Sequence, residues 1–178
     1  RKLGASDVKV SAVTFGAWAA GGMMWGGTDE NDIIAAIRRA YDLGVTSIDT
    51  APIYGYGLSE EFVAKAVAGL PRDRVQILTK FGLRWDREDG EHFFDWRQEG
   101  FGSRKIYRNA RKESVMEECE RSLERLGTET IDLYQCHWRD NTTPVEETME
   151  ALQRLMEQGK ILAAGLHPAL AERLARGK

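Results

Sequence analysis

Short β-rich runs alternate with amphipathic helical stretches along most of this 178-residue chain. This alternation constrains the fold more than any other feature, because it predicts parallel strands joined by right-handed crossover helices. The sequence therefore indicates an α/β fold. The strands are expected at 12–16, 45–50, 75–80, 131–137 and 161–166.

The helix boundaries are predicted from residues that favour helix ends. Thr28 is expected to be the N-cap of the first helix, and Gly44 to end it. A second helix should begin near Ser59, a third should end at Gly127, and a fourth should begin at Pro144. Apolar residues recur with helical spacing inside each of these segments, as expected for helices that cover a sheet.

An open doubly wound sheet and a barrel share this alternation of strands and helices. The positions of polar residues in the strands help to choose between the two folds. Asp49, Lys80 and His137 end three successive strands. Strand periodicity allows all three side chains to face one interior, at the carboxyl ends where barrel enzymes have their active sites. Any one of them alone could be a loop anchor or a satisfied core residue. Three together are costly to bury without partners, so we interpret them as a site in which Asp49 pairs with Lys80.

The loop after the second strand adds two tyrosines, Tyr54 and Tyr56, between glycines that permit a tight return to the next helix. A tyrosine with its ordinary pKa of about 10 is a weak acid at neutral pH. A neighbouring lysine ammonium would lower that pKa and make the tyrosine a better proton donor. The loop therefore offers a candidate general acid.

Several motifs resemble those of the aldo-keto reductase family, in particular its bacterial general-stress-protein type. They extend from about residue 3 to residue 166 and include Phe15-Gly16-Ala17-Trp18, Trp25-Gly26-Gly27-Thr28-Asp29-Glu30, Asp49-Thr50-Ala51 with Tyr54-Gly55, Gly57 and Ser59-Glu60, Thr79-Lys80, and Ile131-Asp132-Leu133-Tyr134-Gln135-Cys136-His137-Trp138. The resemblance implies a (β/α)8 TIM barrel that reduces aldehydes and ketones with a nicotinamide cofactor.

The resemblance also implies a role for each site residue. Tyr54 would be the general acid, Lys80 would lower its pKa, Asp49 would hold Lys80, and His137 would orient the carbonyl. NADPH is the expected cofactor, in preference to NADH, with a small-molecule carbonyl as substrate. The cofactor contacts would be Ala17, Trp18 and Asp49, and the substrate pocket would include Trp18, Trp85 and Trp138. Plain core packing is the alternative interpretation of Trp18 and Trp138.

The chain departs from the family pattern in its number of strands. About five are expected here, after an opening hairpin at Leu3 and 8–10, whereas a TIM barrel closes eight. The fifth strand leads into Gly165-Leu166-His167-Pro168, where the family has Gly-Val-Ser-Asn. We therefore expect residues 1–178 to form a single, incomplete barrel domain. Residues of the polypeptide would be missing after 166, after 178, or both; the alternative is a half-barrel that pairs with a second chain.

Composition excludes several classes of function. A net charge of −3 gives no basic surface for nucleic acid. No apolar run is long enough to span a membrane, and two cysteines are too few for a disulfide framework, so a cytoplasmic location is expected. Cys136 and His137 are neighbours on a strand and point to opposite faces, so no metal site is expected. The segment 21–27 lacks a P-loop lysine and reads as a flexible loop.

Three further interpretations stay open. Lys80 at a barrel strand end could form a Schiff base, as in a lyase, although a paired Asp49 would keep it charged. A protein that retains the fold but binds without catalysis is another alternative. The long segment 81–110, rich in aromatic residues, is either a lid or pocket wall, or a surface excursion that packs on itself.

Overall fold

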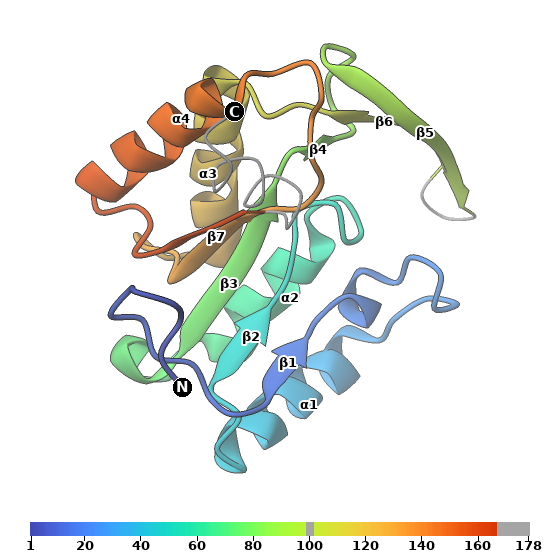
Figure 1. The fold of residues 1–178 in the computed structure, drawn as a ribbon. Helices are drawn as coiled ribbons and strands as arrows, with labels where there is room; N and C mark the ends of the chain where they lie inside the picture. The colour runs from blue at the N-terminus through green and yellow to red at the C-terminus, as the bar shows by residue number, and fades with distance from the viewer. Residues whose placement is uncertain (99–101, 167–178) are drawn as a thin grey trace.

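The computed structural model describes residues 1–98 and 102–166, and its centre is a five-stranded parallel sheet (Figure 1). The strands lie in chain order, so that each new strand pairs with the one before it. This is the arrangement of a barrel wall and confirms the predicted parallel α/β fold. The strands are β1 (Thr14–Gly16), β2 (Ser47–Asp49), β3 (Gln76–Phe81), β7 (Leu133–Cys136) and β8 (Ala164–Gly165).

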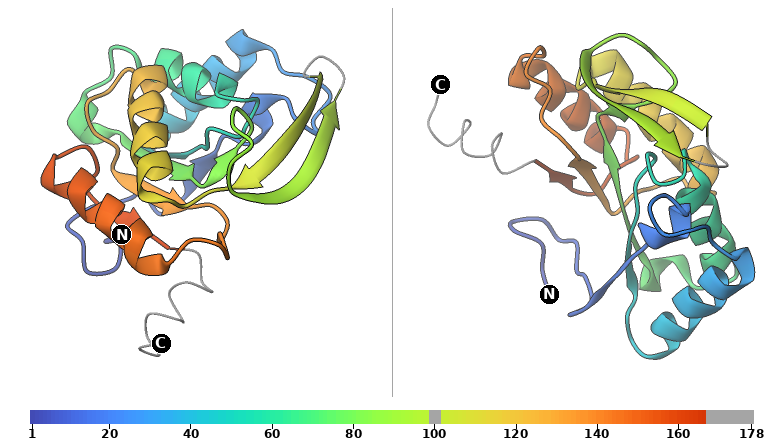
Figure 2. Two further views of the ribbon diagram at one scale, coloured as in Figure 1. Left: turned by 90° about the horizontal axis from the view of Figure 1, so that it is seen from above. Right: turned by 90° about the vertical axis from the view of Figure 1, so that its right-hand side faces the viewer.

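Four α-helices cover one face of this sheet, and neighbouring helices contact one another (Figure 2). Their apolar sides and the helix-facing strand residues form the main core, with Ile77, Val115, Tyr134 and Leu152 nearly inaccessible to solvent. The helices are α1 (Glu30–Asp42), α2 (Leu58–Val67), α3 (Lys112–Leu126) and α4 (Val145–Glu157), with short 3₁₀ turns η1 (Ala19–Gly21) and η2 (Arg72–Arg74). None of the described helices has the length and apolar character that crossing a membrane requires.

The capping of α1 differs from the sequence prediction. Asp29 is the N-cap, and its carboxylate accepts hydrogen bonds from the amides of Asn31 and Asp32. Thr28 was the wrong choice because its hydroxyl donates to the carbonyl of Ala19 instead, 2.9 Å away. The other helix ends lie within a residue or two of those expected, with Gly127 in the left-handed conformation after α3.

The opposite face of the sheet carries the predicted N-terminal hairpin (Figure 2). Val8 of this hairpin packs on Leu78 and Leu133, which point away from the helices. Their sequence neighbours Ile77 and Tyr134 belong to the helix-facing core. The predicted strand parity is therefore confirmed, and Asp49, Lys80 and His137 lie on the parity that faces the barrel interior.

Most of the described residues of segment 81–110 lie in β-strands rather than in one long loop. These strands form a separate antiparallel sheet in the order β4-β6-β5, which extends from the end of β3 (Figure 1). The strands are β4 (Leu83–Arg84), β5 (Glu91–Gln98) and β6 (Gly102–Arg108). The predicted chain break after residue 166 lies outside the described residues.

Candidate active site

Asp49 and Lys80 meet at the carboxyl ends of β2 and β3. The Lys80 ammonium donates to Asp49 Oδ2 at 2.8 Å and to the carbonyl oxygen of Thr50 at 2.7 Å. The lysine side chain is 13% exposed and the aspartate 30%, so the pair lies inside the mouth of the site without being sealed from water. The predicted pairing of Asp49 with Lys80 is confirmed.

Tyr54 and His137 lie beside this ion pair. The Lys80 ammonium is 5.1 Å from the centre of the Tyr54 ring. The Tyr54 ring meets the His137 ring edge to face, with 5.6 Å between ring centres. The fold thus brings all four predicted polar residues together, from β2, the loop after it, β3 and the end of β7. Tyr56 lies apart, with its ring against Trp85 at 5.4 Å.

The acidity of Tyr54 differs from the expectation that Lys80 lowers its pKa. Burial, and next the negative charge of Asp49, raise the pKa of Tyr54 to about 12. Burial also lowers the pKa of Lys80, against the opposing effect of Asp49. The physical reason is that burial disfavours the charged phenolate and that the neighbouring Asp49 carboxylate repels it.

A hydrogen-bonded chain beneath the ion pair fixes the β2–α2 loop. The hydroxyls of Thr50 and Ser59 are 2.8 Å apart, and Ser59 donates to the carbonyl of Ala17. The Ala17 amide donates to the carbonyl of Asp49 at 2.8 Å, and the Ala17 side chain is buried in the main core. Ala17 therefore joins the ends of β1 and β2. Both the amide and the carbonyl of Ala17 are engaged in hydrogen bonds within the protein.

Two glycines allow the loop with Tyr54 to approach η1 closely. A Cβ on Gly21 would lie 2.4 Å from the Tyr54 carbonyl carbon, and one on Gly55 would lie 2.5 Å from the Gly21 carbonyl oxygen. Any larger residue at either position would push the two loops apart. Gly21, at the start of segment 21–27, thus has a defined packing role. The interpretation of this segment as a flexible loop did not predict that role.

An aromatic pocket of about 360 Å³ opens beside Tyr54 and His137. Trp18 and Trp138 line it, as predicted, and each is a little over two-fifths exposed. Trp85 does not line it, because its ring is turned to Tyr56, which corrects its placement in the substrate pocket. The remaining lining comes from residues that sequence reasoning did not assign to the pocket individually: Met23, Met24, Ile53, Leu83, Phe93, Phe94 and Trp96.

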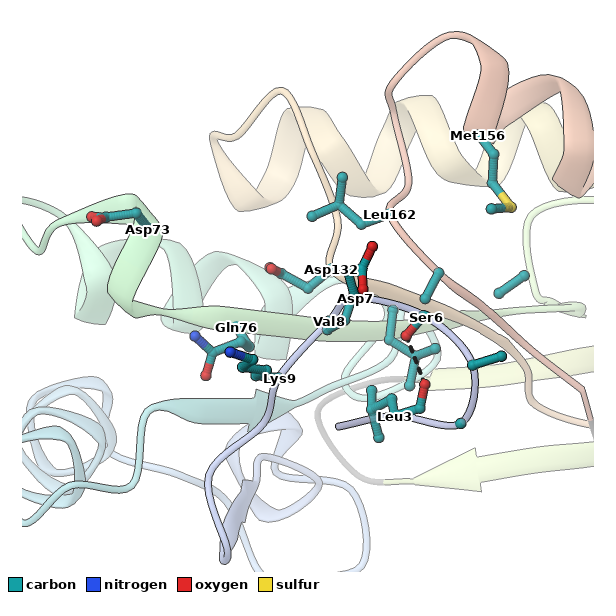
Figure 3. A pocket seen from close by; sticks show the side chains of 15 residues that line it. Leu3, Ser6, Asp7, Val8, Lys9, Asp73, Gln76, Asp132, Met156 and Leu162 are labelled. Carbon is teal, nitrogen blue, oxygen red and sulfur yellow. Dashed lines mark hydrogen bonds between the residues drawn. The ribbon is translucent and has the colours of Figure 1, made fainter. Parts of the chain in front are cut away.

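A larger hollow of about 1040 Å³ lies at the other end of the sheet, under the N-terminal hairpin (Figure 3). It is lined by Asp73, Gln76 and Asp132, near the amino ends of β3 and β7, and by the half-exposed Leu162. Barrel enzymes have their chemistry at the carboxyl ends, where the polar cluster lies. The smaller aromatic pocket is therefore the candidate active site.

Comparison with known proteins agrees with this geometry. The model of the aldo/keto reductase family matches residues 12–176. The chain belongs to the aldo/keto reductase family. The aldo-keto reductase YhdN of Bacillus subtilis is 44% identical over 162 residues, which are 90% of this chain and 44% of that protein. The NADH-specific methylglyoxal reductase of Escherichia coli is 40% identical over 168 residues, 92% of this chain and 50% of that one.

Solved structures of aldo-keto reductases share the fold. A glycerol dehydrogenase from Gluconobacter oxydans superposes with a TM-score of 0.77 and 39% identity, covering 96% of this chain and 49% of that one. An aldo-keto reductase from Klebsiella pneumoniae in complex with NADPH superposes with a TM-score of 0.69 and 32% sequence identity. The match covers 94% of this chain and 50% of that one. The chain thus spans about half the length of the relatives it matches and forms part of a TIM barrel. Among the described residues, no group of histidine, cysteine and acidic side chains could hold a metal ion.

Proposed function

We propose that this aldo/keto reductase chain reduces aldehydes and ketones to alcohols, with Tyr54 as the proton donor. The observation that carries the proposal is the meeting of Tyr54, His137 and the Asp49–Lys80 pair at the carboxyl ends of the strands, beside an apolar pocket. In this proposal His137 orients the substrate carbonyl, and Tyr54 protonates its oxygen as hydride reaches its carbon.

The raised pKa of Tyr54, about 12, is compatible with this role. It keeps the phenol protonated at neutral pH, which a proton donor requires. An alkoxide that forms on the substrate is a stronger base than a phenolate, so the proton still moves toward the product. Lys80, 5.1 Å from the ring centre, then stabilises the phenolate that remains. Asp49 keeps Lys80 charged and in place.

The residues at the pocket mouth fit a nicotinamide ring. Trp18 is 44% exposed, with its ring centre 6.3 Å from that of Tyr54. A reduced nicotinamide would supply the hydride. Trp18 would contact the ring, and Asp49 and Ala17 would shape the floor below it. We propose NADPH as the cofactor, since the Klebsiella relative was solved in complex with it. The test also includes NADH, because the Escherichia coli relative is NADH-specific.

The geometry favours this reaction over the Schiff-base alternative. An amine that attacks a carbonyl has to be free of its proton and of its partners. Lys80 instead donates to two oxygens, Asp49 Oδ2 and the Thr50 carbonyl. Borohydride should therefore trap no carbonyl compound on Lys80.

The test is to follow oxidation of NADPH and of NADH by the protein with a panel of neutral aldehydes and ketones, including the methylglyoxal named for the Escherichia coli relative. We expect carbonyl-dependent loss of reduced cofactor and formation of the alcohol. Tight cofactor binding, followed by fluorescence, without turnover of any carbonyl would contradict the proposal and favour a binding protein.

A further inference from the structure

Four polar side chains behind the candidate active site are completely buried. Thr50, Ser59, Glu60 and Thr79 have no surface exposed to solvent. Thr79 lies in β3 directly before Lys80, and Ser59 and Glu60 lie in the first turn of α2. Burying polar groups costs free energy unless each of them finds a partner. Their hydrogen bonds therefore decide whether this burial serves the fold alone or also the site.

The hydrogen bonds of these side chains close a ring that includes Lys80. The Lys80 ammonium donates to the carbonyl of Thr50 at 2.7 Å, and the Thr50 hydroxyl lies 2.8 Å from that of Ser59. Ser59 is followed by Glu60, whose Oε1 accepts from the Thr79 hydroxyl at 2.7 Å. The peptide bond from Thr79 to Lys80 completes the ring, so one set of contacts holds both the backbone and the ammonium of Lys80. We refer to these five residues as the Lys80 ring.

Glu60 also connects the Lys80 ring to α3. Its second oxygen, Oε2, accepts from Nε of Arg125 at 2.7 Å. The Arg125 side chain is 20% exposed and lies against Gly57, since a Cβ on Gly57 would be 2.7 Å from Arg125 Cδ. Gly57 belongs to the loop that carries Tyr54 and precedes α2. One side chain of α3 therefore contacts both the ring and the Tyr54 loop.

Stability of the fold does not by itself account for a charge at Glu60. A buried ion pair can often be replaced by apolar residues of similar volume at little or no cost in stability. The charge does act on Lys80: burial lowers the pKa of the ammonium, whereas the negative charges of Asp49 and Glu60 raise it. Lys80 thus has two counter-charges, Asp49 inside the site and Glu60 on the helix side of β3.

On the basis of the proposed carbonyl reduction, we propose that Glu60 is a positioning residue, which closes the Lys80 ring and so holds the ammonium beside Tyr54. Glu60 lies outside the described lining of the pocket, and its carboxylate acts from behind β3. Loss of its charge should therefore leave substrate binding intact and weaken the stabilisation of the Tyr54 phenolate. The expected signature is a lower kcat with an unchanged KM, as for an interaction made only in the transition state.

The first test breaks the Lys80 ring at two points. Glu60→Gln keeps the shape of the side chain but removes its charge, and Thr79→Val removes the hydroxyl that closes the ring. With a neutral aldehyde and NADPH, we expect kcat to fall by about tenfold in Glu60→Gln and by about two- to tenfold in Thr79→Val. KM should stay within about twofold of the parent value in both. Circular dichroism checks that each variant folds, and Thr79→Val decides the outcome if Glu60→Gln does not.

Two similarly buried groups outside the ring provide matched controls. Asp132 is 7% exposed and pairs with Arg72 at 2.7 Å, near the amino end of β7. The Thr148 hydroxyl, on α4, donates to the carbonyl of Ala110 at 2.7 Å. Asp132→Asn and Thr148→Val should lower the midpoint of urea unfolding without lowering kcat. Losses of kcat in these controls as large as those in the ring variants would show that the rate only follows stability, and would overturn the inference.

The second test observes Lys80 without turnover. In protein that contains lysine labelled with ¹³C at Cε, the NMR signal of Lys80 is assigned by its loss in Lys80→Arg and followed against pH. The midpoint of its titration should lie at lower pH in Glu60→Gln than in the parent, by about half a unit or more, because a negative charge behind the ammonium is removed. The other titratable groups of the site, Asp49, Tyr54 and His137, are unchanged in this variant.

The two tests separate failure of this inference from failure of the proposed function. If the parent reduces no carbonyl compound, the proposed function fails, and the NMR titration alone decides the role of Glu60. A lower midpoint in Glu60→Gln then supports the action of Glu60 on Lys80. The same midpoint in both proteins contradicts it, whatever the catalytic result.

Discussion

The parallel sheet and the antiparallel β4-β6-β5 sheet supply opposite kinds of surface to one pocket. The parallel sheet supplies polar groups at its strand ends, such as the Lys80 ammonium within 2.8 Å of Asp49 and of the Thr50 carbonyl. The antiparallel sheet supplies the rings of Phe93, Phe94 and Trp96, arranged by a register shift. In the proposed function, the first region supplies the groups that react and the second supplies apolar surface beside them.

The two regions also owe their positions to different interactions. Strand ends of the parallel sheet are fixed by backbone pairing, so their side chains occupy the places that strand periodicity assigns. The antiparallel sheet is joined to α3 by ion pairs. Arg84, which is 1% exposed, pairs with Glu117 of α3, and Asp86, which also pairs with Arg84, pairs with Arg121 of α3. Substitutions in the parallel sheet should therefore change rates for every substrate.

The largest expected effect is that of Tyr54→Phe. Loss of the proton donor should lower kcat by about 10²- to 10⁴-fold for every carbonyl compound. The melting temperature should stay close to that of the parent, because the ring and its contacts with Trp18 and His137 remain. Steady-state kinetics with two aldehydes and thermal unfolding measure the two effects.

Tyr56→Phe is the matched control for this prediction. Its ring packs against Trp85 and under the Arg104 guanidinium, away from Lys80. It should retain near-parent activity. A large loss of activity in Tyr56→Phe, together with a small one in Tyr54→Phe, would show that the wrong tyrosine was assigned.

Asp49→Asn should reduce both rate and stability, which separates it from Tyr54→Phe. The amide removes the negative charge beside the Lys80 ammonium but leaves the bond from Lys80 to the Thr50 carbonyl. Since Asp49 is 30% exposed, water compensates part of the loss. We expect the free energy of unfolding to fall by about 1–3 kcal/mol, less than for a fully buried pair. Urea unfolding measures it, and equal midpoints and slopes for the two proteins would mean that the ion pair does not stabilise the fold.

The residues that sequence analysis located correctly are those fixed by a regular period. Asp49, Lys80 and His137 end strands, so alternation alone places them on one face. Segment 81–110 was predicted only as a whole, as a lid or pocket wall or as a surface excursion, because a register shift in β5 breaks the alternation that would assign its individual side chains to one face. Trp85 directly follows β4, outside the regular strand period, and its ring lies against Tyr56 rather than in the lining of the pocket.

The error about Tyr54 acidity has another origin. Proximity to Lys80 was inferred correctly, and the ring lies 5.1 Å from the ammonium. The direction of the pKa shift, however, depends on burial of the phenol and on the negative charge of the nearby Asp49 carboxylate. Neither quantity is encoded in the spacing of residues along the chain. Both arise only when strands, loops and covering side chains are assembled.

A smaller effect is expected for Gly165→Ala in β8. A Cβ there would lie 2.8 Å from Cγ of Gln135, whose amide nitrogen approaches Asp49 Oδ1 at 3.4 Å. Displacement of Gln135 should loosen Asp49 and lower kcat by about two- to tenfold, because a single hydrogen bond contributes about 0.5–1.5 kcal/mol. KM should change little, and the loss should be the same for different aldehydes.

A double-mutant cycle tests whether Gly165 acts through Gln135. Gln135→Ala removes the Cγ that the new methyl group would meet, so Gly165→Ala on that background should cause little further loss of kcat. Additive losses from the two substitutions would instead mean that Gly165 affects the rate by another route, such as the pairing of β8 with β7.

The last expected effect concerns stability alone and the joint between the two regions, where Glu118 of α3 hydrogen-bonds Gly82, the residue between β3 and β4. Both carboxyl oxygens of Glu118 accept from the Gly82 amide, at 3.1 and 3.2 Å, and the side chain is almost fully buried. Burial raises the pKa of Glu118 to about 8, against the opposing charge of Arg84. Between its unfolded pKa near 4.5 and this value, the folded protein binds more protons than the unfolded chain.

Glu118 should therefore make the protein less stable as pH rises from about 5 to 8, by up to about 1.4 kcal/mol per pH unit, with no further loss above that range. Glu118→Gln lacks this ionisation, so its unfolding free energy should fall less over the same interval. Urea titrations at pH 5, 6, 7 and 8 measure the difference between variant and parent, and Glu124→Gln, exposed on the same helix, is the matched control. Parallel pH profiles for Glu118→Gln and the parent would show that the carboxyl group at the joint does not titrate in this range.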